Sequence, residues 1–522
     1  SSSVSTPSRI LSFFGRLNYN LMERYLLTVT FRADGSSKFA PSNRWGYFPA
    51  AALGWRMSEE AFLNDVDWLD NLKLPVSYGE VGNDGINSSL WSQNWEATSD
   101  KRYQGAVNGA FLPSYSLGAD MANKDLKWET TITRNIGVDF GFFNSRLTGT
   151  IDAYWNTTKD LLMKTAIPGI TGFTSTYANV GQTSNKGIEI ALQGVLVKTR
   201  DWNVTAGFNI NFNRGKVDKL ADNVTGLYGT EWATSSTFPK SDYVLKEGRP
   251  VGLVRGLTAD GFYTTDDFTY ENGVYTLKEG VADVSSAVFP NYHLHNGMNE
   301  RPAGQLAYPG MAKFKDLNDD GIINDDDVDV IGDMTPVHTG GFNINATYKN
   351  FDLGLYFNWS YGNEIYNVNK LAALYGYKEG AVYENKLSIV KDCYKIYDVV
   401  NGELVALTTP EQLNAANANA KLPLAYSENG YVSTLGIEDG SYLRLNTLTL
   451  GYTLPKSMLQ KAGISNLRVY GSIYNVFTIT GYSGIDAEVS TSTSTKTYPQ
   501  LGMDWGTYPR ARSFVLGVNL SF

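Results

Sequence analysis

The sequence predicts an all-β protein, and more specifically a transmembrane antiparallel β-barrel. Apolar residues recur at every second position, so side chains alternate between the two faces of each strand. These alternating segments run for ten residues or more, whereas strands of soluble proteins usually have about 5–6 residues. A tilted barrel strand needs about 9–11 residues to cross a bilayer. The length of the predicted strands therefore favours a barrel in lipid.

The composition excludes several other classes of protein. The 522 residues include 53 acidic and 44 basic side chains, which gives a net charge of −9. This balance argues against a nucleic-acid-binding protein, which carries a basic patch or stripe. The single cysteine excludes an internal disulfide framework. No apolar run reaches the roughly 18 residues of a membrane-spanning helix, and the serine-rich start is not a signal peptide.

The segment 202–213 shows the alternation clearly. One face of this predicted strand carries apolar side chains: Trp202, Val204, Ala206, Phe208, Ile210 and Phe212. The other face carries small and polar ones: Asn203, Thr205, Gly207, Asn209, Asn211 and Asn213. Aromatic residues also gather at strand ends, as in the interfacial girdles of membrane proteins. A soluble all-β protein with long strands is the alternative that this pattern leaves open.

Thirteen segments follow the alternating pattern, and their connections differ in length. The segments are 10–19, 25–34, 46–57, 72–81, 127–143, 147–162, 184–197, 202–213, 339–348, 351–361, 442–453, 467–477 and 514–522. Short connections include 20–24, 144–146, 198–201 and 349–350, and the long ones are 82–126, 214–338, 362–441 and 478–513. Outer-membrane barrels combine short periplasmic turns with long extracellular loops. We therefore expect 214–338 and 362–441 to be long extracellular loops.

Two connections predict short helices, and one strand predicts a bulge. Residues 58–64 (SEEAFLN) begin with a serine that can cap a helix, followed by an acidic first turn. Residues 455–462 (PKSMLQKA) begin with a proline suited to the first helical turn. Midway through 442–453 the apolar phase slips by one residue, which predicts a β-bulge near Asn446.

An odd number of strands does not close as an antiparallel barrel, because the first and last segments would be parallel. Open edges in lipid leave backbone groups unpaired, and bacterial single-chain barrels normally have an even number of strands. We therefore expect the chain to be the C-terminal part of a larger barrel that begins in an outer loop at 1–9. The functional particle is expected to contain further strands paired along both edges, 10–19 and 514–522.

Several sequence blocks, taken together in order, carry a family resemblance. They are SFFGRLNYNLMERYLLTVTFRADGSSKF (12–39), NRWGYFPAAALGWRMSEEAFL (43–63), LKLPVSYGEVGND (72–84), LKWETTITRNIGVDFGFFNSRLTGTIDAYWNTTKDLL (126–162), NVGQTSNKGIEIAL (179–192), YLRLNTLTLGYTLP (442–455), LRVYGSIYNVFTIT (467–480) and FVLGVNLSF (514–522). In this order they resemble the SusC-like (SusC/RagA) family of TonB-dependent outer-membrane transporters. Pro75 departs from the family pattern, which more often has a residue other than proline there, and predicts a second bulge.

The resemblance implies both an architecture and an activity. It implies a barrel of about 22 strands with a plugged lumen, of which this chain would supply the last thirteen or so, without the plug domain. It also implies TonB-dependent import of oligosaccharides or other large polar nutrients across the bacterial outer membrane. The implied partners are a SusD-like surface lipoprotein and TonB, the latter acting through the absent N-terminal part. Peptides are the alternative cargo on the same fold.

One segment has the spacing of a calcium-binding loop. In DLNDDGIINDDD (316–327), the candidate ligands occupy loop positions 1, 3, 5, 7 and 12: Asp316, Asn318, Asp320, Ile322 and Asp327. Gly321 at position 6 permits the sharp turn, Ile322 would contribute its backbone carbonyl, and Asn324 at position 9 would act through water. We expect a structural calcium ion here. Magnesium or sodium, and an acidic turn without a metal, are the alternatives.

Other candidate sites are weak. His293, His295 and His338 do not predict zinc, because no cysteine lies near them in the sequence. No Ser/His/Asp arrangement has a supporting G-x-S-x-G turn, so the sequence does not predict an enzyme. Cys393 is expected to be an unreactive thiol in a loop. Six loop aromatics either pack the loops together or stack on sugar rings: Trp91, Trp95, Tyr103, Tyr375, Tyr377 and Tyr383.

The sequence therefore favours a nutrient importer over the other functions considered. Its predicted lumen face is rich in Asn, Thr, Ser and Tyr, which hydrogen-bond a hydroxylated cargo without holding it tightly. The alternative from a different class is a surface glycan-binding β protein that does not transport, and a passive porin is a third. The sequence does not identify the residues that contact the substrate.

Overall fold

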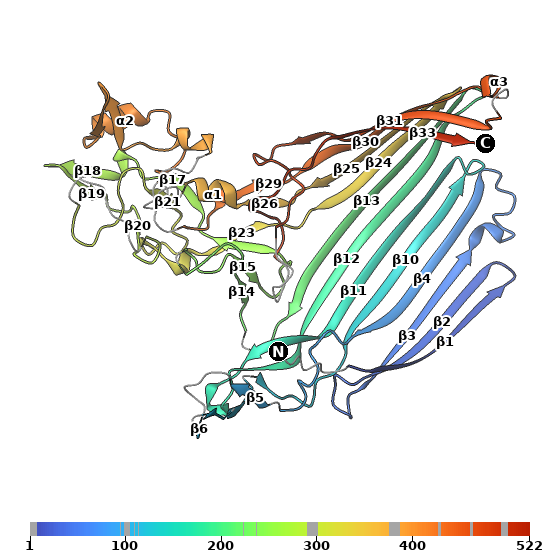
Figure 1. Ribbon diagram of the computed structural model, residues 1–522, viewed down its shortest axis with the longest axis horizontal. Helices are drawn as coiled ribbons and strands as arrows, with labels where there is room; N and C mark the ends of the chain where they lie inside the picture. The colour runs from blue at the N-terminus through green and yellow to red at the C-terminus, as the bar shows by residue number, and fades with distance from the viewer. Residues whose placement is uncertain are drawn as a thin grey trace.

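The computed structural model describes residues 8–93, 95–98, 105–108, 110–112, 114–118, 120–222, 224–235, 237–289, 301–374, 387–425, 430–459, 463–491 and 500–522. In these residues one long antiparallel sheet of thirteen strands follows the chain order (Figure 1). Its strands are β1 (Ile10–Leu21), β2 (Tyr25–Ser36), β3 (Trp45–Arg56), β4 (Leu69–Asn83), β10 (Glu129–Phe142), β11 (Leu147–Ala166), β12 (Ser175–Lys198), β13 (Trp202–Lys219), β24 (His338–Tyr348), β25 (Phe351–Tyr361), β30 (Tyr442–Thr453), β31 (Asn466–Thr480) and β33 (Ser513–Ser521). A two-residue strand, β9 (Asp120–Met121), pairs in parallel with the start of β12.

The alternation of the sequence becomes rows of side chains that run across the sheet. Phe208 on β13 pairs with Leu192 on β12 and with Phe342 on β24. The next residue, Asn209, pairs with Ala191 and Gly341 on the same two strands. Because paired residues share a face, one face collects apolar rows and the other collects polar rows. Each of the thirteen predicted segments lies on one strand of this sheet, which confirms the predicted fold class.

Several strands are longer than predicted, and two of them are very long. β11 has 20 residues and β12 has 24, about twice the 9–11 that a bilayer crossing requires. The prediction ended the first at residue 162 and began the second at residue 184. The ladder shifts register between Thr158 and Leu161, and Asp160 has a positive φ of 59°. This bulge lies within the predicted segment 147–162, and the parts that the prediction missed, 163–166 and 175–183, flank the connection 167–174.

The connections at the two ends of the sheet differ strongly (Figure 1). At one end, here called the turn end, tight turns such as 22–24 and 349–350 join neighbouring strands. Met22, Glu23 and Lys349 in these turns have positive φ, between 52° and 58°. At the opposite end, here called the loop end, the chain passes through 84–128, 220–337, 362–441 and 481–512. The predicted alternation of short and long connections is confirmed.

The helix predictions at the turn end are confirmed for one segment and wrong for the other. In 455–462, α3 spans Lys456–Leu459, and residues 460–462 lie outside the described part. In 58–64, only a 3-10 turn forms, at Met57–Glu59. The carboxylate of Glu60 instead accepts hydrogen bonds from the Tyr25 hydroxyl (2.6 Å) and the Trp55 indole (3.1 Å). These contacts hold the segment against the ends of β2 and β3.

One of the two predicted bulges is present. Against β25 the register of β30 shifts between Leu445 and Thr447, which leaves Asn446 as the extra residue. Against β31 the shift at the same place leaves the extra residue on β31, because Leu445 and Thr447 pair with Phe477 and Tyr474. At Pro75 the prediction is wrong. Pro75 pairs with Gly54, and β4 keeps the same register against β10 on both sides of it; the shift in that ladder lies between Gly141 and Phe142.

The long loops at the loop end form a packed structure, here called the loop body (220–337, 362–441 and 481–512). Its helices and strands are β14 (Leu227–Gly229), β15 (Tyr243–Leu245), β16 (Leu253–Gly256), β17 (Ala259–Phe262), β18 (Phe268–Glu271), β19 (Val274–Leu277), β20 (Asp283–Val284), β21 (Ala312–Phe314), β22 (Ile322–Ile323), β23 (Asp329–Asp333), β26 (Glu364–Asn367), α1 (Val368–Leu374), β27 (Tyr397–Val400), β28 (Glu403–Ala406), α2 (Pro410–Asn417), β29 (Ile437–Asp439) and β32 (Met503–Asp504). The separate loop 84–128 holds β9 and four more short strands, β5 (Trp95–Thr98), β6 (Ala106–Val107), β7 (Ala110–Phe111) and β8 (Ser114–Leu117).

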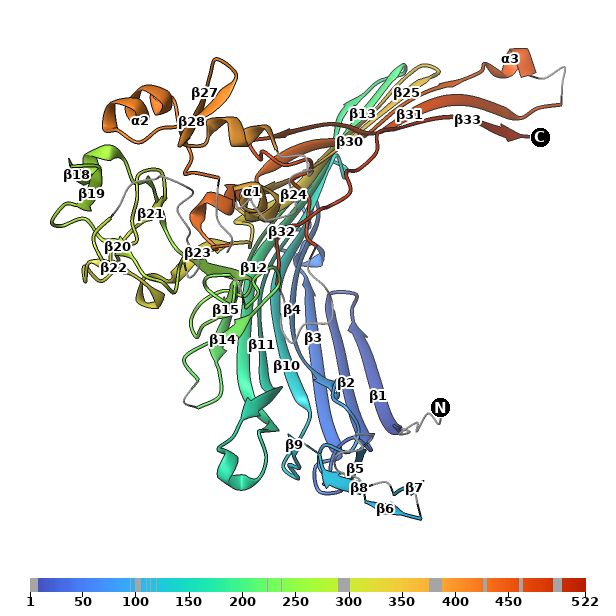
Figure 2. The same cartoon turned by 60° about the vertical axis from the view of Figure 1, so that its left-hand side comes forward.

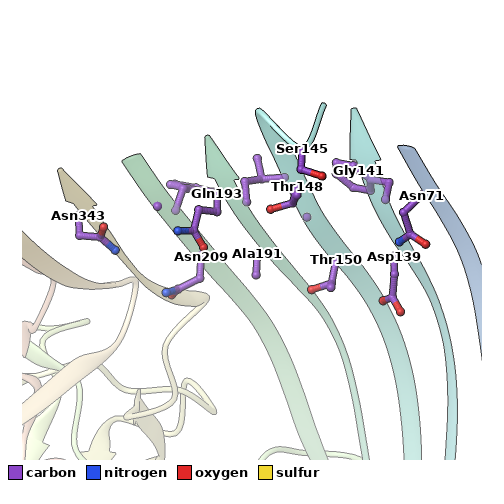
Figure 3. Close-up of a pocket in the computed structure, with 15 residues that line it drawn as sticks. Asn71, Asp139, Gly141, Ser145, Thr148, Thr150, Ala191, Gln193, Asn209 and Asn343 are labelled. Carbon is purple, nitrogen blue, oxygen red and sulfur yellow. The ribbon is translucent and has the colours of Figure 1, made fainter. Parts of the chain in front are cut away.

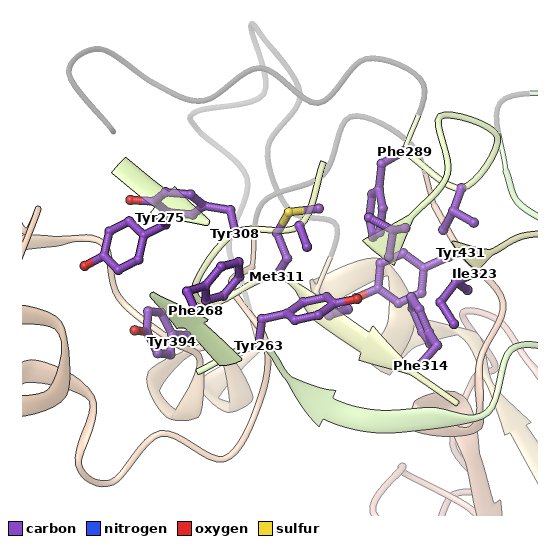
Figure 4. Packing of buried hydrophobic residues seen from close by; sticks show 14 of the residues in the cluster. Tyr263, Phe268, Tyr275, Phe289, Tyr308, Met311, Phe314, Ile323, Tyr394 and Tyr431 are labelled. Atoms are coloured by element: carbon purple, nitrogen blue, oxygen red, sulfur yellow. The ribbon is translucent and has the colours of Figure 1, made fainter. Parts of the chain in front are cut away.

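An aromatic core holds the loop body together (Figure 4). Tyr263, Tyr275 and Tyr308 are fully buried in it, and Phe314 and Tyr431 pack at 5.2 Å between ring centroids. The hydroxyl of Tyr263 donates to the carbonyl of Ala282 at 2.6 Å. Such buried rings, with their hydroxyls hydrogen-bonded, bring together residues from two loops that are far apart in the sequence.

Both edges of the long sheet are open in the described part of the chain. β1 pairs only with β2, and β33 pairs only with β31 (Figure 2). The segments 10–19 and 514–522 are therefore the two edges, as predicted, and they do not pair with each other. The helices of the described residues are too short and too polar to span a membrane.

Candidate functional site

The polar face of the long sheet carries a groove near the turn end (Figure 3). This polar groove has a volume of about 530 Å³ and extends from β4 to β24. Its polar side chains are Asn71, Asp139, Ser145, Thr148, Thr150, Gln193, Asn209 and Asn343. Amides and hydroxyls predominate, so the groove offers hydrogen-bond donors and acceptors together.

The strand register builds the polar groove from neighbouring rows. In one row, Thr148 pairs with Gln193, which pairs with Gly207. Gly207 pairs in turn with Asn343 on β24. A side chain at Gly207 would place its Cβ only 2.7 Å from the amide nitrogen of Asn343. Glycine at this position therefore lets the Asn343 side chain lie across the row.

Several charges on the polar face are paired. The ammonium of Lys73 lies 3.1 Å from a carboxylate oxygen of Asp139, the one ionisable residue that lines the polar groove. Further along the sheet, Arg468 binds Asp352 with both arms of its guanidinium, at 2.8 and 2.5 Å. Asp152 and Glu189, which pair across β11 and β12 on the same face, form no ion pair among the described residues, so this face also carries unpaired negative charge.

The opposite face is apolar and aromatic. Phe342 stacks on Phe357 with ring centroids 4.3 Å apart. At the turn end, Trp202 packs on Tyr348 at 4.4 Å. Aromatic rings at the margins of an apolar band are typical of the water–lipid interface. The two faces therefore have the chemistry of a lumen wall and a lipid-facing wall.

The predicted calcium loop is folded by its own backbone. The carboxylate of Asp316 accepts from the backbone N–H of Gly321 at 2.7 Å, and that of Asp320 accepts from the N–H of Ile322 at 2.9 Å. The Asn318 amide donates to Asp320 at 2.9 Å. Asp327 is fully buried and accepts from the N–H of Leu317 at 2.7 Å.

This arrangement leaves the calcium site as a prediction. The donor types suit a hard cation that prefers oxygen. However, in the part of the chain that the structure describes, no three acidic, histidine or cysteine side chains are close enough to hold a metal. The Asp327 carboxylate also accepts from the N–H of Asn324 at 2.8 Å, which closes a capping box around 324–327. Ile322 is exposed on the two-residue strand β22.

The weaker candidates have structural roles where they are described. Nδ1 of His338 accepts a hydrogen bond from the Trp359 indole at 3.1 Å, whereas His293 and His295 lie outside the described residues. Cys393 is buried, and burial raises the pKa of its thiol to about 11. Such a thiol stays protonated and unreactive at neutral pH.

The six loop aromatics are only partly described. Trp95 is 65% exposed, whereas Trp91 is half-buried. The remaining four lie outside the described residues: Tyr103, Tyr375, Tyr377 and Tyr383. Of the two described, Trp95 presents the larger ring surface to solvent.

The sequence did not predict a buried ion-pair network at the loop end. Arg444 on β30 is 1% exposed and pairs with Asp486 and Glu488 of the loop 481–512. Its Nε donates to the Thr478 hydroxyl at 3.0 Å. A single arginine in the strand 442–453, two residues before the bulge, was the available signal. Its partners lie in a loop whose path the strand pattern does not specify.

Comparison with known proteins shows the family. The model of the family described as "TonB dependent receptor-like, beta-barrel" matches residues 1–476. TonB-dependent receptor P3 of Formosa agariphila is 31% identical over 530 residues, which are 100% of this chain and 46% of that protein. TonB-dependent receptor SusC of Bacteroides thetaiotaomicron is 31% identical over 527 residues, 99% of this chain and 44% of that protein. The chain thus spans about half the length of these relatives.

Solved structures agree with the sequence relatives. The structure described as the RagAB peptide transporter has a TM-score of 0.71 at 25% identity, over 99% of this chain and 48% of that chain. The RagAB peptide importer in its "open-open" state has a TM-score of 0.73 at 24% identity and shows the same fold, over 99% of this chain and 47% of that chain. This chain belongs to the TonB-dependent receptor family and corresponds to its β-barrel.

Proposed function

We propose that this chain forms part of an outer-membrane importer that uses TonB-transmitted energy to take up oligosaccharides or other large polar nutrients. The observation that carries the proposal is the division of the long sheet into two faces. Rows of amide and hydroxyl groups line the polar groove, and the apolar rows lie on the opposite face. A lumen wall of this kind solvates a polar cargo, while the other face contacts lipid.

The family supports the import part of this proposal. TonB-dependent receptors are the relatives of the chain along its whole length. The neighbour described as a peptide transporter supports peptides as the alternative cargo. A SusD-like surface lipoprotein is the proposed partner, and the loop body is the surface that it would meet. The long loops would then face the outside of the cell, and the turn end would face the periplasm.

The non-transporting alternative, a surface glycan-binding protein, has less support. Such a protein needs no apolar face on strands of ten or more residues. In this chain that face is exposed to a large extent at Phe13 (61%) and Leu516 (90%). An extended apolar surface of this size requires lipid or protein to cover it.

Uptake by cells that carry variants of the complete protein tests the proposal. Gln193→Trp places a large ring in the polar groove, whereas the matched control Ile190→Trp places the same ring on the opposite face of the same strand. We expect Gln193→Trp to slow uptake of a labelled oligosaccharide strongly, and Ile190→Trp to leave it near the wild-type rate. Uptake should stop in cells that lack TonB. Rapid uptake in TonB-deficient cells would contradict the proposal and favour a porin.

A further inference from the structure

A second cavity lies within the loop body, between the loops 362–441 and 481–512. Its volume is about 590 Å³, which is within the range of small-molecule sites. Side chains from both loops line it, among them Asn369, Lys370, Ile389, Asp392, Ile485 and Asp504. It is remote in the sequence from the strands that form the polar groove. We call it the loop cavity.

Asp504 of the loop cavity has an incomplete set of hydrogen bonds. The residue is 3% exposed, and one carboxylate oxygen, Oδ2, accepts from the Tyr482 hydroxyl at 2.7 Å. The other oxygen, Oδ1, is buried and has no hydrogen-bond partner among the described residues. A buried carboxylate with an unused oxygen is unfavourable unless a donor or a cation satisfies it.

The nearby charged side chains do not provide a partner for Oδ1 of Asp504. Lys370 is the one basic side chain that lines the loop cavity, and its ammonium already lies 3.2 Å from a carboxylate oxygen of Glu438. Asp392 adds a second carboxylate to the lining. Within the described residues, neither Asp392 nor Asp504 forms an ion pair, so the loop cavity is negatively charged.

The rest of the lining is aliphatic. Leu387, Ile389 and Ile485 contribute apolar surface, and the described lining includes no aromatic ring on which a sugar would stack. Ile485 is 74% exposed at the rim. A ligand that matches this lining carries a positive charge together with a short aliphatic part.

A metal ion matches the loop cavity less well. In the described part of the chain, no three acidic, histidine or cysteine side chains are close enough to coordinate one. An ammonium group needs fewer ligands, because it donates up to three hydrogen bonds. Besides Asp504 Oδ1, the hydroxyl of Thr507 is also buried without a partner among the described residues.

We propose that the loop cavity binds a primary ammonium group, with Asp504 as its counter-charge and Thr507 as a further hydrogen-bond partner. The inference rests on the proposed function, because an importer needs cargo-binding groups on its loop end. The ammonium group has two sources in large polar nutrients: the amino terminus or lysine side chain of a peptide, and the amine of an amino sugar. The aliphatic lining provides contacts for the carbon atoms next to it.

Calorimetric titration of the complete protein in detergent tests the proposal. The peptide probes are trialanine and N-acetyl-trialanine, and the sugar probes are the glucosamine trimer and the N-acetylglucosamine trimer. At least one free amine should bind at least tenfold more tightly than its acetylated counterpart, and the better of the two identifies the source. Asp504→Asn, which keeps the shape of the side chain, should abolish this preference.

Two further variants separate binding from folding. Glu403→Gln changes an exposed carboxylate outside the loop cavity and should leave the affinity unchanged. Ser388→Phe places a ring at the exposed rim and should weaken binding without changing Asp504. Equal affinity for free and acetylated probes, or an unchanged preference in a folded Asp504→Asn protein, overturns the inference. TonB-dependent uptake of oligosaccharides by the same cells would then still support the proposed function.

Discussion

The guanidinium of Arg444 on β30 is buried against the carboxylate of Asp486, which lies 42 residues later in the loop 481–512. Glu488 of the same loop lies 3.3 Å from the other arm of the guanidinium, and Arg510 pairs with Glu488 at 2.9 Å. Both side chains are buried, with 2% of the Arg444 side chain and 8% of the Asp486 side chain exposed. This network joins the last long loop to the wall of the sheet, directly beside the bulge at Asn446.

Removal of Arg444 should release this loop. Arg444→Met leaves the buried Asp486 carboxylate with the backbone N–H of Glu488 at 2.9 Å and the guanidinium of Arg510 at 4.0 Å. The loss of one partner from a buried ion pair costs about 3–5 kcal/mol. We expect faster hydrogen exchange throughout 481–491. Arg510→Met is the control, because its side chain is 48% exposed and such pairs contribute about 0–1 kcal/mol. Similar exchange in the two variants would contradict a central role for Arg444.

The two faces of the sheet should tolerate charge differently. Phe208→Lys and Leu355→Lys place an ammonium on the apolar face and should cost roughly 2–4 kcal/mol near mid-bilayer. Asn209→Lys, next to Phe208 on the polar face, should cost much less because the lumen is hydrated. Equilibrium unfolding in lipid vesicles measures the difference. Equal costs on the two faces would show that the orientation of the sheet is wrong.

The alternation in the sequence was sufficient to predict the long sheet, because each side chain of a β-strand must match one of two environments. It was less complete at strand ends and in the connections. It did not predict that β12 begins as early as Ser175. It also predicted a helix at 58–64, where the structure has only a 3-10 turn and the Glu60 carboxylate accepts hydrogen bonds from Tyr25 and Trp55. The partners of Arg444 and the loop cavity at Asp504 were not predictable, because they depend on how two long loops pack.

The loop body should lose stability in acid through Asp267. Burial raises the pKa of this carboxyl, but hydrogen bonds from Lys313 (2.7 Å) and Thr264 outweigh it, so the pKa lies below its ordinary value of 3.8. A lowered acid pKa contributes stability above pH 3.8 that is lost as the pH falls further. Asp267→Asn should therefore destabilise the protein at pH 6 and have a smaller effect near pH 2. Thermal unfolding at the two pH values measures this; an equal effect at both would contradict it.

The segment 316–327 should bind calcium. Calorimetric titration of chelator-treated protein with calcium chloride should give a binding signal that the combined Asp316→Ala and Asp320→Ala substitutions remove. Asp326→Ala is the control, because position 11 of the loop is not a ligand position. Crystals grown with calcium should show an ion about 2.3–2.6 Å from the oxygens of Asp316, Asn318 and Asp320. The absence of both signals would favour the acidic turn without a metal.

The bulge at Asn446 leads to a deletion experiment. On one side of it Leu445 pairs with Phe357, and on the other Thr447 pairs with Tyr356. These partners are adjacent and lie on opposite faces, so against β25 the deletion of Asn446 joins two residues that already alternate correctly. On β31 the partners of the same two residues are Phe477 and Tyr474, which are three residues apart and so also lie on opposite faces. We therefore expect the deletion variant to keep its apolar and polar rows and to fold into the barrel.

Deletion of Asn345 is the matched control, because β24 keeps one register against both neighbours along its whole length. Loss of this asparagine shifts one half of the strand by one residue and moves its side chains to the wrong face. The fraction of each protein that migrates as a folded barrel in unheated gel electrophoresis gives the comparison. Removal of Asn446 should leave most of the protein folded, and removal of Asn345 should leave little. If both deletions abolish folding, Asn446 is not a removable insertion, and the bulge itself is required for the strand to pair.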